Sequence, residues 1–246
     1  MKNVWFYVCL NIQISNPMEK RISFLLHLLF VIIVAIELTG RIVGDIRMEY
    51  PVKPLIMIWM AIYFLRFRKK MEFTAPVIIA FFFSWVGDIF LMFSGRGEIF
   101  FFAGVGGFFL AQISYIYTFA KFSENGGRGY LARNPVIGLL FLGYVAGIFY
   151  LLYPVLEGLM KPILLIYALS LIGMSMMALN RQGRVNRNSY LLVFVGSLFF
   201  VISDSMIALD KFYHEIPMTG LWIMITYIAA QYMIMRGLLL EQPVRT

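Results

Sequence analysis

The chain has 246 residues, of which 61% are hydrophobic and only 14% are charged, and its mean hydropathy is +0.81. A soluble domain is nearer half apolar and a quarter charged, so this composition excludes an ordinary soluble protein. Apolar stretches of about 20 residues recur along the whole chain, and each is long enough to cross a bilayer. The sequence therefore predicts an all-α integral membrane protein.

The apolar stretches predict eight transmembrane helices in a single membrane domain, residues 22–240. A tail of residues 1–21 precedes this domain, and a tail of residues 241–246 follows it. The longest polar connection runs only from Lys121 to Asn134, which leaves no room for a soluble domain. In chain order the predicted spans are 22–40, 52–66, 74–93, 99–120, 135–153, 160–179, 190–209 and 216–240.

The net charge of +8 follows from membrane topology. Fifteen of the 21 Lys and Arg residues fall on the side of the membrane that holds both termini, and six fall on the other side. By the positive-inside rule, both termini are predicted to be cytoplasmic, and the membrane is the inner one if the protein is bacterial. The distribution calls for no nucleic-acid partner.

The two halves of the domain, 22–120 and 135–240, share an ordered pattern. Each begins its second span with a Lys-Pro pair, at 53–54 and 161–162, and then carries an aspartate in its third span and a glutamine in its fourth. A duplication of four spans would give two parallel repeats with a site between them. Chance accounts for the pattern equally well, because proline suits the first turn of any helix.

Two aspartates, Asp88 in the third span and Asp204 in the seventh, mark the candidate site most strongly. A carboxylate near the middle of a bilayer costs roughly 3 kcal/mol, so it usually faces a partner or a polar cavity. Two adjacent carboxylates can share one proton and so supply a general acid and a general base for hydrolysis through a cationic carbon. The structural alternative is an ion pair with Lys53 or Lys161 that fixes helix register.

By the predicted topology, three further ionisable residues lie in the same layer as the aspartates, near the non-cytoplasmic face: Lys53, Lys161 and Glu37. The lysines either snorkel to the interface or bind a lipid phosphate, and Glu37 either lines the site or marks the membrane boundary. Gln112 and Gln231, in spans four and eight, are expected to hydrogen-bond in the bundle interior. Tyr115 and Tyr227 lie one turn from them, but tyrosine is common in such helices and carries no specific signal.

Metal and cofactor chemistry find no support in the sequence. Cys9 is the only cysteine, and His27 and His214 fall on opposite sides of the membrane by the predicted topology. No serine lies in a G-x-S-x-G elbow, and neither a P-loop nor a dinucleotide-binding fingerprint is present. The glycines inside the fourth span are expected to serve helix packing: Gly104, Gly106 and Gly107.

Four ordered motifs between residues 50 and 237 resemble signatures of the YhhN/lysoplasmalogenase family of membrane proteins. Residues 83–92 (FSWVGDIFLM) resemble the first signature, residues 203–209 (SDSMIAL) with Lys211-Phe212 the second, and residues 226–231 (TYIAAQ) the third. Lys53-Pro54 matches a further dipeptide of that family. The family often has histidine where this chain has Gln112, a residue that hydrogen-bonds but does not titrate.

The resemblance implies an eight-span hydrolase that cleaves the vinyl-ether bond of lysoplasmalogens to a fatty aldehyde and a glycerophospho-base. Asp88 and Asp204 would be the catalytic residues, and neither a metal nor another cofactor would be needed. The implied partners are a lysophospholipid substrate and the membrane lipids, with no nucleic acid. The residues predicted to bind the substrate are Lys53, Lys161, Glu37, Gln112, Tyr115, Ser203, Tyr227 and Gln231.

Two other functions fit the same residues. A small-molecule or proton-coupled transporter would also use an internal repeat and charges within the membrane. A lipid-binding membrane protein without catalytic activity would keep the same fold and cavity. The sequence gives no indication of the oligomeric state.

Overall fold

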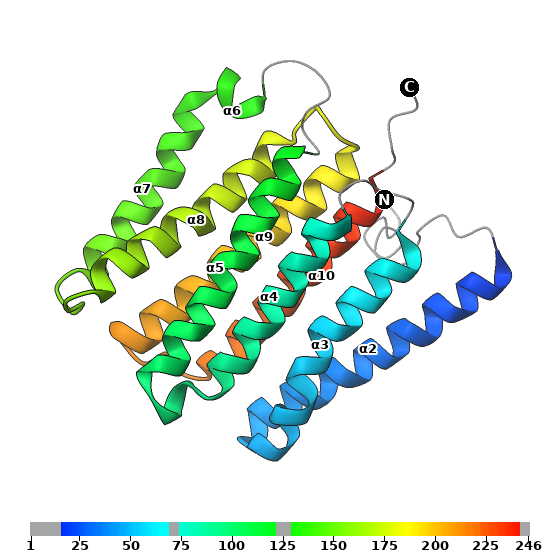
Figure 1. Cartoon of the computed structure of the whole chain (residues 1–246), viewed down its shortest axis with the longest axis horizontal. Helices are drawn as coiled ribbons and strands as arrows, with labels where there is room; N and C mark the ends of the chain where they lie inside the picture. Colours follow the sequence, from blue (N-terminus) through cyan, green and yellow to red (C-terminus); the bar gives the residue numbers. More distant parts are fainter. Residues whose placement is uncertain (1–15, 69–73, 122–128, 242–246) are drawn as a thin grey trace.

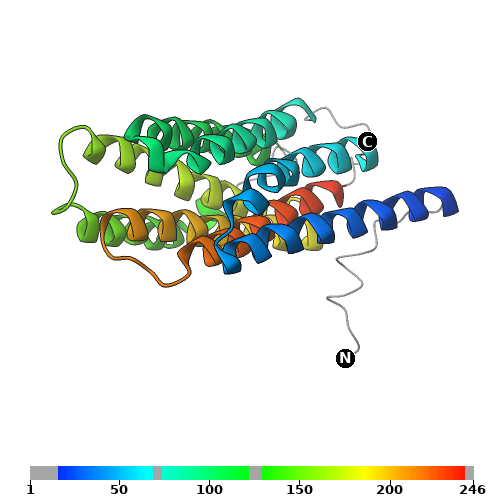
Figure 2. The ribbon, with the colours of Figure 1, turned by 90° about the horizontal axis from the view of Figure 1, so that it is seen from below.

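The computed structural model describes residues 16–68, 74–121 and 129–241, which are almost entirely helical and contain no strand. Eight long helices run side by side along one direction (Figure 1). In Figure 2 they form two layers, with α3, α4 and α5 in one and α2, α9 and α10 in the other. The long helices are α2 (Pro17–Val43), α3 (Ile46–Phe67), α4 (Thr74–Met92), α5 (Glu98–Lys121), α7 (Pro135–Leu152), α8 (Met160–Asn180), α9 (Arg187–Phe212) and α10 (Thr219–Leu239). Two short helices join them, η1 (Ser94–Arg96) and α6 (Tyr130–Arg133).

Each predicted span corresponds to one of the long helices, which confirms the all-α prediction. Seven of these helices are long and apolar enough to cross a membrane. The eighth, α3, has sufficient length but is more polar, since it carries Arg47, Glu49, Lys53 and Arg66. The count of eight spans and the orientation of the termini therefore stay predictions.

The helix boundaries follow local capping signals and differ from the predicted ones. The Met18 N–H donates to the Asn16 side chain (2.9 Å) with Pro17 in the first turn, so α2 begins five residues before the predicted span. Gly44 ends α2 in the left-handed conformation (φ 73°). Asp45 caps α3 by accepting from the Arg47 N–H (2.9 Å), so α3 begins at Ile46 and not at residue 52. Of the predicted tails, residues 1–15 and 242–246 lie outside the described residues.

Helices α4 and α5 pack with their backbones in close contact. A Cβ placed on Gly107 would lie 2.8 Å from the backbone nitrogen of Gly87 and 3.1 Å from the Phe83 carbonyl oxygen. A Cβ on Gly104 would meet the Leu91 side chain at 2.7 Å. No heavy atom lies within 4 Å of a Cβ placed on Gly106, so the prediction that this glycine serves helix packing was wrong. In the other layer, α10 packs equally closely on α9, because a Cβ placed on Gly237 would meet Val193 and the Ser189 carbonyl oxygen.

Corresponding helices of the two halves also pack in corresponding ways. The contact of α3 with α4 corresponds to the contact of α8 with α9. In the same way, the contact of α5 with α8 corresponds to the contact of α10 with α3. A duplication with a twofold axis between the halves would produce this arrangement. The repeat stays a prediction, which this packing supports.

We predict that Gly107→Ala lowers the free energy of unfolding by about 1–3 kcal/mol, because the new methyl group meets backbone atoms that cannot move aside. Gly106→Ala is the matched control, since it adds the same methyl group one residue away in open space. Thermal unfolding of both variants in one detergent measures the difference. Equal melting temperatures for the two variants would contradict the close contact between α4 and α5.

Candidate active site

Asp88 lies inside the bundle on α4, where it is only 2% exposed. One carboxylate oxygen forms an ion pair with the Lys53 ammonium of α3, at 3.7 Å. The other accepts a hydrogen bond from the Tyr227 hydroxyl of α10, at 2.8 Å. Three helices thus meet at this carboxylate, and the cation beside it stabilises its ionised form.

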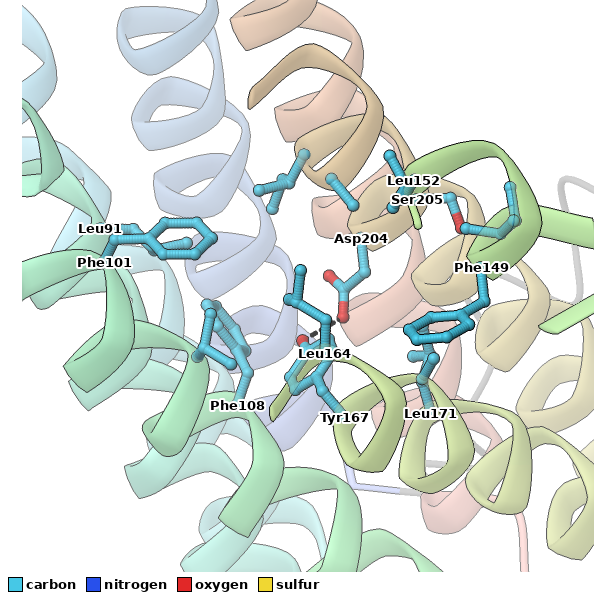
Figure 3. Close-up of a pocket in the computed structure, with 15 residues that line it drawn as sticks. Leu91, Phe101, Phe108, Phe149, Leu152, Leu164, Tyr167, Leu171, Asp204 and Ser205 are labelled. Atoms are coloured by element: carbon cyan, nitrogen blue, oxygen red, sulfur yellow. Dashed lines mark hydrogen bonds between the residues drawn. The ribbon is translucent and has the colours of Figure 1, made fainter. Parts of the chain in front are cut away.

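Asp204 lies on α9 and is 6% exposed, but its partners are neutral. Its Oδ2 accepts hydrogen bonds from the Gln112 amide of α5 (3.2 Å) and from the Tyr167 hydroxyl of α8. Figure 3 shows the second oxygen of Asp204 facing the space between the aliphatic and aromatic side chains around it.

Two glutamines extend this network between the halves. Gln112, besides donating to Asp204, accepts a hydrogen bond from the Ser170 hydroxyl of α8. Gln231 of α10 donates to Ser84 Oγ (3.0 Å), one helical turn from Asp88, and accepts from the Tyr115 hydroxyl (2.5 Å). Each glutamine is fully buried and reaches from its own half to the aspartate-bearing helix of the other.

The remaining predicted site residues divide between the site and its surroundings. Glu37 is fully buried and accepts from Arg41 at 3.2 Å, and Arg41 in turn pairs with Glu49 at 3.0 Å. Ser203 is buried next to Asp204, but its hydroxyl donates to the Ile223 carbonyl (3.2 Å). Lys161 lies over the Tyr153 ring, 4.0 Å from its centroid, and the structure does not bring it to either aspartate.

Lys53 and Lys161 differ because of where their helices begin. Lys161 is the second residue of α8, whereas α3 starts at Ile46 and places Lys53 two turns inside the bundle. In the first half a lysine lies next to the aspartate, so the repeat pattern suggested a lysine next to Asp204 as well. Tyr167, six residues after Lys161, occupies that position instead. Sequence reasoning missed Tyr167, Ser170 and Ser84, since hydroxyl residues are common in membrane helices and carry no distinct signal.

Asp204 lines one cavity, and Lys53, the ion-pair partner of Asp88, lines a second. The first, called the apolar cavity here, has a volume of about 70 Å³, and Asp204, Tyr167 and Ser205 are its polar lining (Figure 3). Its walls come from α4, α5, α7, α8 and α9, and of the α7 residues only Val145 and Leu152 are buried. The apolar residues of the wall are Leu91, Phe101, Val105, Phe108, Ile148, Phe149, Leu152, Leu164, Ala168, Leu171, Ile207 and Ala208.

The second cavity, called the vestibule here, is larger and more polar, with a volume of about 450 Å³. It lies at the end of the bundle where α2 ends and α3 begins, and Lys53 forms part of its lining. Leu91, Phe101 and Ile207 line both cavities and form the partition between them. The other residues of the vestibule are Arg41, Ile46, Glu49, Tyr50, Met92, Ser94, Asp210, Lys211, Gly220, Ile223 and Met224.

The described residues contain no group of three or more His, Cys, Asp or Glu side chains that could hold a metal ion. What the site offers chemically is proton transfer. It holds one carboxylate with a cation beside it, one carboxylate with neutral donors, and a cavity large enough for about two water molecules.

The fold and the site together define a class: a polytopic α-helical membrane protein with a carboxylate-based site inside its helix bundle. Comparison with known proteins gives the family. The chain belongs to the YhhN family, whose match covers residues 48–238 and includes every helix from α4 to α9 and nearly all of α3 and α10. The predicted family is thereby confirmed.

Curated relatives include two mammalian proteins named lysoplasmalogenase TMEM86A. The chain is 29% identical to the human protein over 188 residues, and 30% identical to the bovine protein over 187 residues. Each alignment covers 74% of this chain and 73% of the relative. No solved structure is significantly similar to the chain.

We predict strong energetic coupling between Lys53 and Asp88. Lys53→Met leaves a buried carboxylate without its cation, which costs about 3–5 kcal/mol of unfolding free energy. Adding Asp88→Asn removes the uncompensated charge, so the double variant should be more stable than Lys53→Met alone. Unfolding of the two single variants and the double variant in mixed detergent gives the coupling energy.

Lys161→Met is the matched control, because that lysine lies over the Tyr153 ring and its loss should cost about 1 kcal/mol or less. Additive effects of the Lys53 and Asp88 substitutions would show that the ion pair does not stabilise the bundle.

Proposed function

We propose that this protein is a lysoplasmalogenase, a membrane hydrolase that cleaves the vinyl-ether bond of a lysoplasmalogen to a fatty aldehyde and a glycerophospho-base. The observation that carries the proposal is a pair of buried carboxylates beside two adjacent cavities: Asp204 lines the apolar cavity, and Lys53, the ion-pair partner of Asp88, lines the polar one. In a lysoplasmalogen the vinyl-ether bond joins a polar glycerophospho group to an apolar chain. Membership of the YhhN family and the names of the mammalian relatives support the same activity.

The polarity of the two cavities suggests how the substrate lies. The polar group would occupy the vestibule, and the first carbons of the chain would enter the apolar cavity, while the rest of the chain would leave along its α7 wall, which holds few buried residues. The vinyl-ether bond would then cross the partition of Leu91, Phe101 and Ile207. Asp204 borders the apolar side of this partition, and Lys53, paired with Asp88, borders the polar side.

In this mechanism Asp204 is the general acid. Its two hydrogen-bond donors are neutral and both address Oδ2, so a proton on Oδ1 would face the apolar cavity and the β-carbon of the vinyl ether. The carbon–carbon π electrons take this proton, and the positive charge that develops is shared by the α-carbon and the ether oxygen. Tyr167 and Gln112 position the acid and stabilise the carboxylate that it leaves behind.

Asp88 is the general base in the same mechanism. Lys53 keeps it ionised, and Tyr227 orients it. Asp88 removes a proton from the water that attacks the α-carbon, which gives a hemiacetal. The carbon–oxygen bond to glycerol then breaks: the glycerol oxygen takes the proton from Asp88, and the hemiacetal hydroxyl returns one to Asp204. Both carboxyl groups finish as they began, and the water has been divided between the two products.

A direct assay of aldehyde release tests the proposal. Purified protein is incubated with a lysoplasmenyl lipid, and the wild type is compared with Asp88→Asn and Asp204→Asn. Each substitution keeps the shape of the side chain and removes its acid–base capacity, so we expect kcat to fall about 10²–10⁴-fold. Asp45→Asn is the matched control, because Asp45 caps α3 and asparagine caps a helix equally well.

Undiminished aldehyde release by both folded variants would contradict the carboxylate mechanism. Transport of the lipid or of protons into proteoliposomes without any aldehyde would instead favour the carrier hypothesis. Tight lysolipid binding without turnover would favour a lipid-binding protein.

A further inference from the structure

Arg41, in the last turn of α2, takes no part in the proposed acid–base steps, and its side chain lies between three helices. Its Nε and Nη2 both donate to Glu37 Oε1 of the same helix, at 3.2 Å. Its Nη2 also pairs with Glu49 Oε2 of α3, at 3.0 Å. A Cβ placed on Gly220 of α10 would lie only 2.9 Å from Arg41 Nη1. The guanidinium therefore contacts α10 as well as α3.

The two helices that this guanidinium joins to α2 are the ones that supply both partners of Asp88. On α3, Glu49 lies four residues, about one turn, before Lys53. On α10, Gly220 lies seven residues, about two turns, before Tyr227. Residues at these spacings lie on one face of a helix, so the guanidinium contacts α3 and α10 on the faces that reach the carboxylate.

The contact of Arg41 with α3 is close and largely shielded from solvent. A Cβ placed on Gly40 would lie 3.1 Å from Glu49 Cγ and 3.1 Å from Met48 Cβ, so the end of α2 packs directly on the first turns of α3. The paired side chains are only 21% and 13% exposed, and Glu37, which holds the other side of the guanidinium, is fully buried. A planar guanidinium that binds two carboxylates in this way has little freedom to rotate.

We propose that Arg41 is a positioning residue for the hydrolysis. It holds α3 and α10 at the spacing at which Lys53 and Tyr227 keep Asp88 ionised and oriented as the general base. This inference rests on the proposed function and adds a residue from outside the segment that matches the family, because that match begins at residue 48 and α2 ends at Val43.

Gly220→Ala tests the inference without removing a charge. The new methyl group meets the far end of the flexible Arg41 side chain, which turns aside at little cost, and alanine favours a helix more than glycine does. We expect kcat for aldehyde release to fall about three- to tenfold, with KM unchanged and the melting temperature no lower. Gly106→Ala is the matched control, since it adds the same methyl group in open space and should leave kcat unchanged.

A compensated double variant separates positioning from stability. Arg41→Met alone leaves Glu37 buried without its cation and destabilises the bundle, and adding Glu37→Gln removes that charge. The double variant should regain most of the melting temperature that Arg41→Met loses, but kcat should stay about tenfold below that of the wild type. Adding Gly220→Ala to the double variant should cause no further loss, because the guanidinium that the methyl group displaces is absent.

Recovery of kcat together with the melting temperature would show that Arg41 only stabilises the fold, and would overturn the inference. A rise in KM with kcat unchanged would also overturn it, because Arg41 lines the vestibule and would then be a substrate contact. A further fall in kcat when Gly220→Ala is added to the double variant would show that the methyl group acts without Arg41.

The energetic coupling between Lys53 and Asp88, measured by unfolding, separates failure of this inference from failure of the proposed function, because it needs no substrate. In the Glu37→Gln/Arg41→Met background this coupling energy should fall by about half. If the wild type releases no aldehyde, such a loss of coupling would still support the positioning role of Arg41. An unchanged coupling energy would contradict that role, whether or not the protein hydrolyses the lipid.

Discussion

Polar groups inside a bilayer must find their partners within the protein, and this requirement organises the whole bundle around Asp88 and Asp204. Asp88 takes a cation from α3 and a hydroxyl from α10, whereas Asp204 takes an amide from α5 and a hydroxyl from α8. The two carboxylates therefore connect six helices. Close packing of α4 on α5 and of α9 on α10, through glycines, brings these partners within reach.

The difference between the two environments is what makes the site chemically useful. A carboxylate beside an ammonium is stabilised as an anion, while a carboxylate among neutral donors in an apolar cavity gains less from ionisation. Asp204 lines the apolar cavity and Lys53, the partner of Asp88, lines the vestibule, which matches the division of a single-chain lipid into an apolar and a polar part. Carriers also have parallel repeats with a central site, so the fold alone does not favour hydrolysis over transport. The family and the carboxylate pair are what favour hydrolysis.

Composition was sufficient to predict the helical membrane fold, since stretches of about 20 apolar residues have few other solutions. Asp88, Asp204, Gln112 and Gln231 were also identifiable, because buried polar residues stand out in apolar helices. Tyr167 was missed, and Lys161 reaches neither aspartate, for one reason: contact depends on the depth and rotation of each helix. The capped start of α3 at Ile46, six residues before the predicted boundary, carries Lys53 to Asp88, and no matching extension of α8 carries Lys161 to Asp204.

The central claim is that a carboxylic acid protonates the β-carbon of a vinyl ether, and the origin of one hydrogen atom tests it. Hydrolysis in D2O, with the aldehyde trapped at once by reduction to prevent later exchange, should place a single deuterium on the carbon next to the former carbonyl. Mass spectrometry of the trapped alcohol measures this. Product without deuterium at that carbon would contradict proton donation from an exchangeable acid such as Asp204, and with it the mechanism built on the two carboxylates.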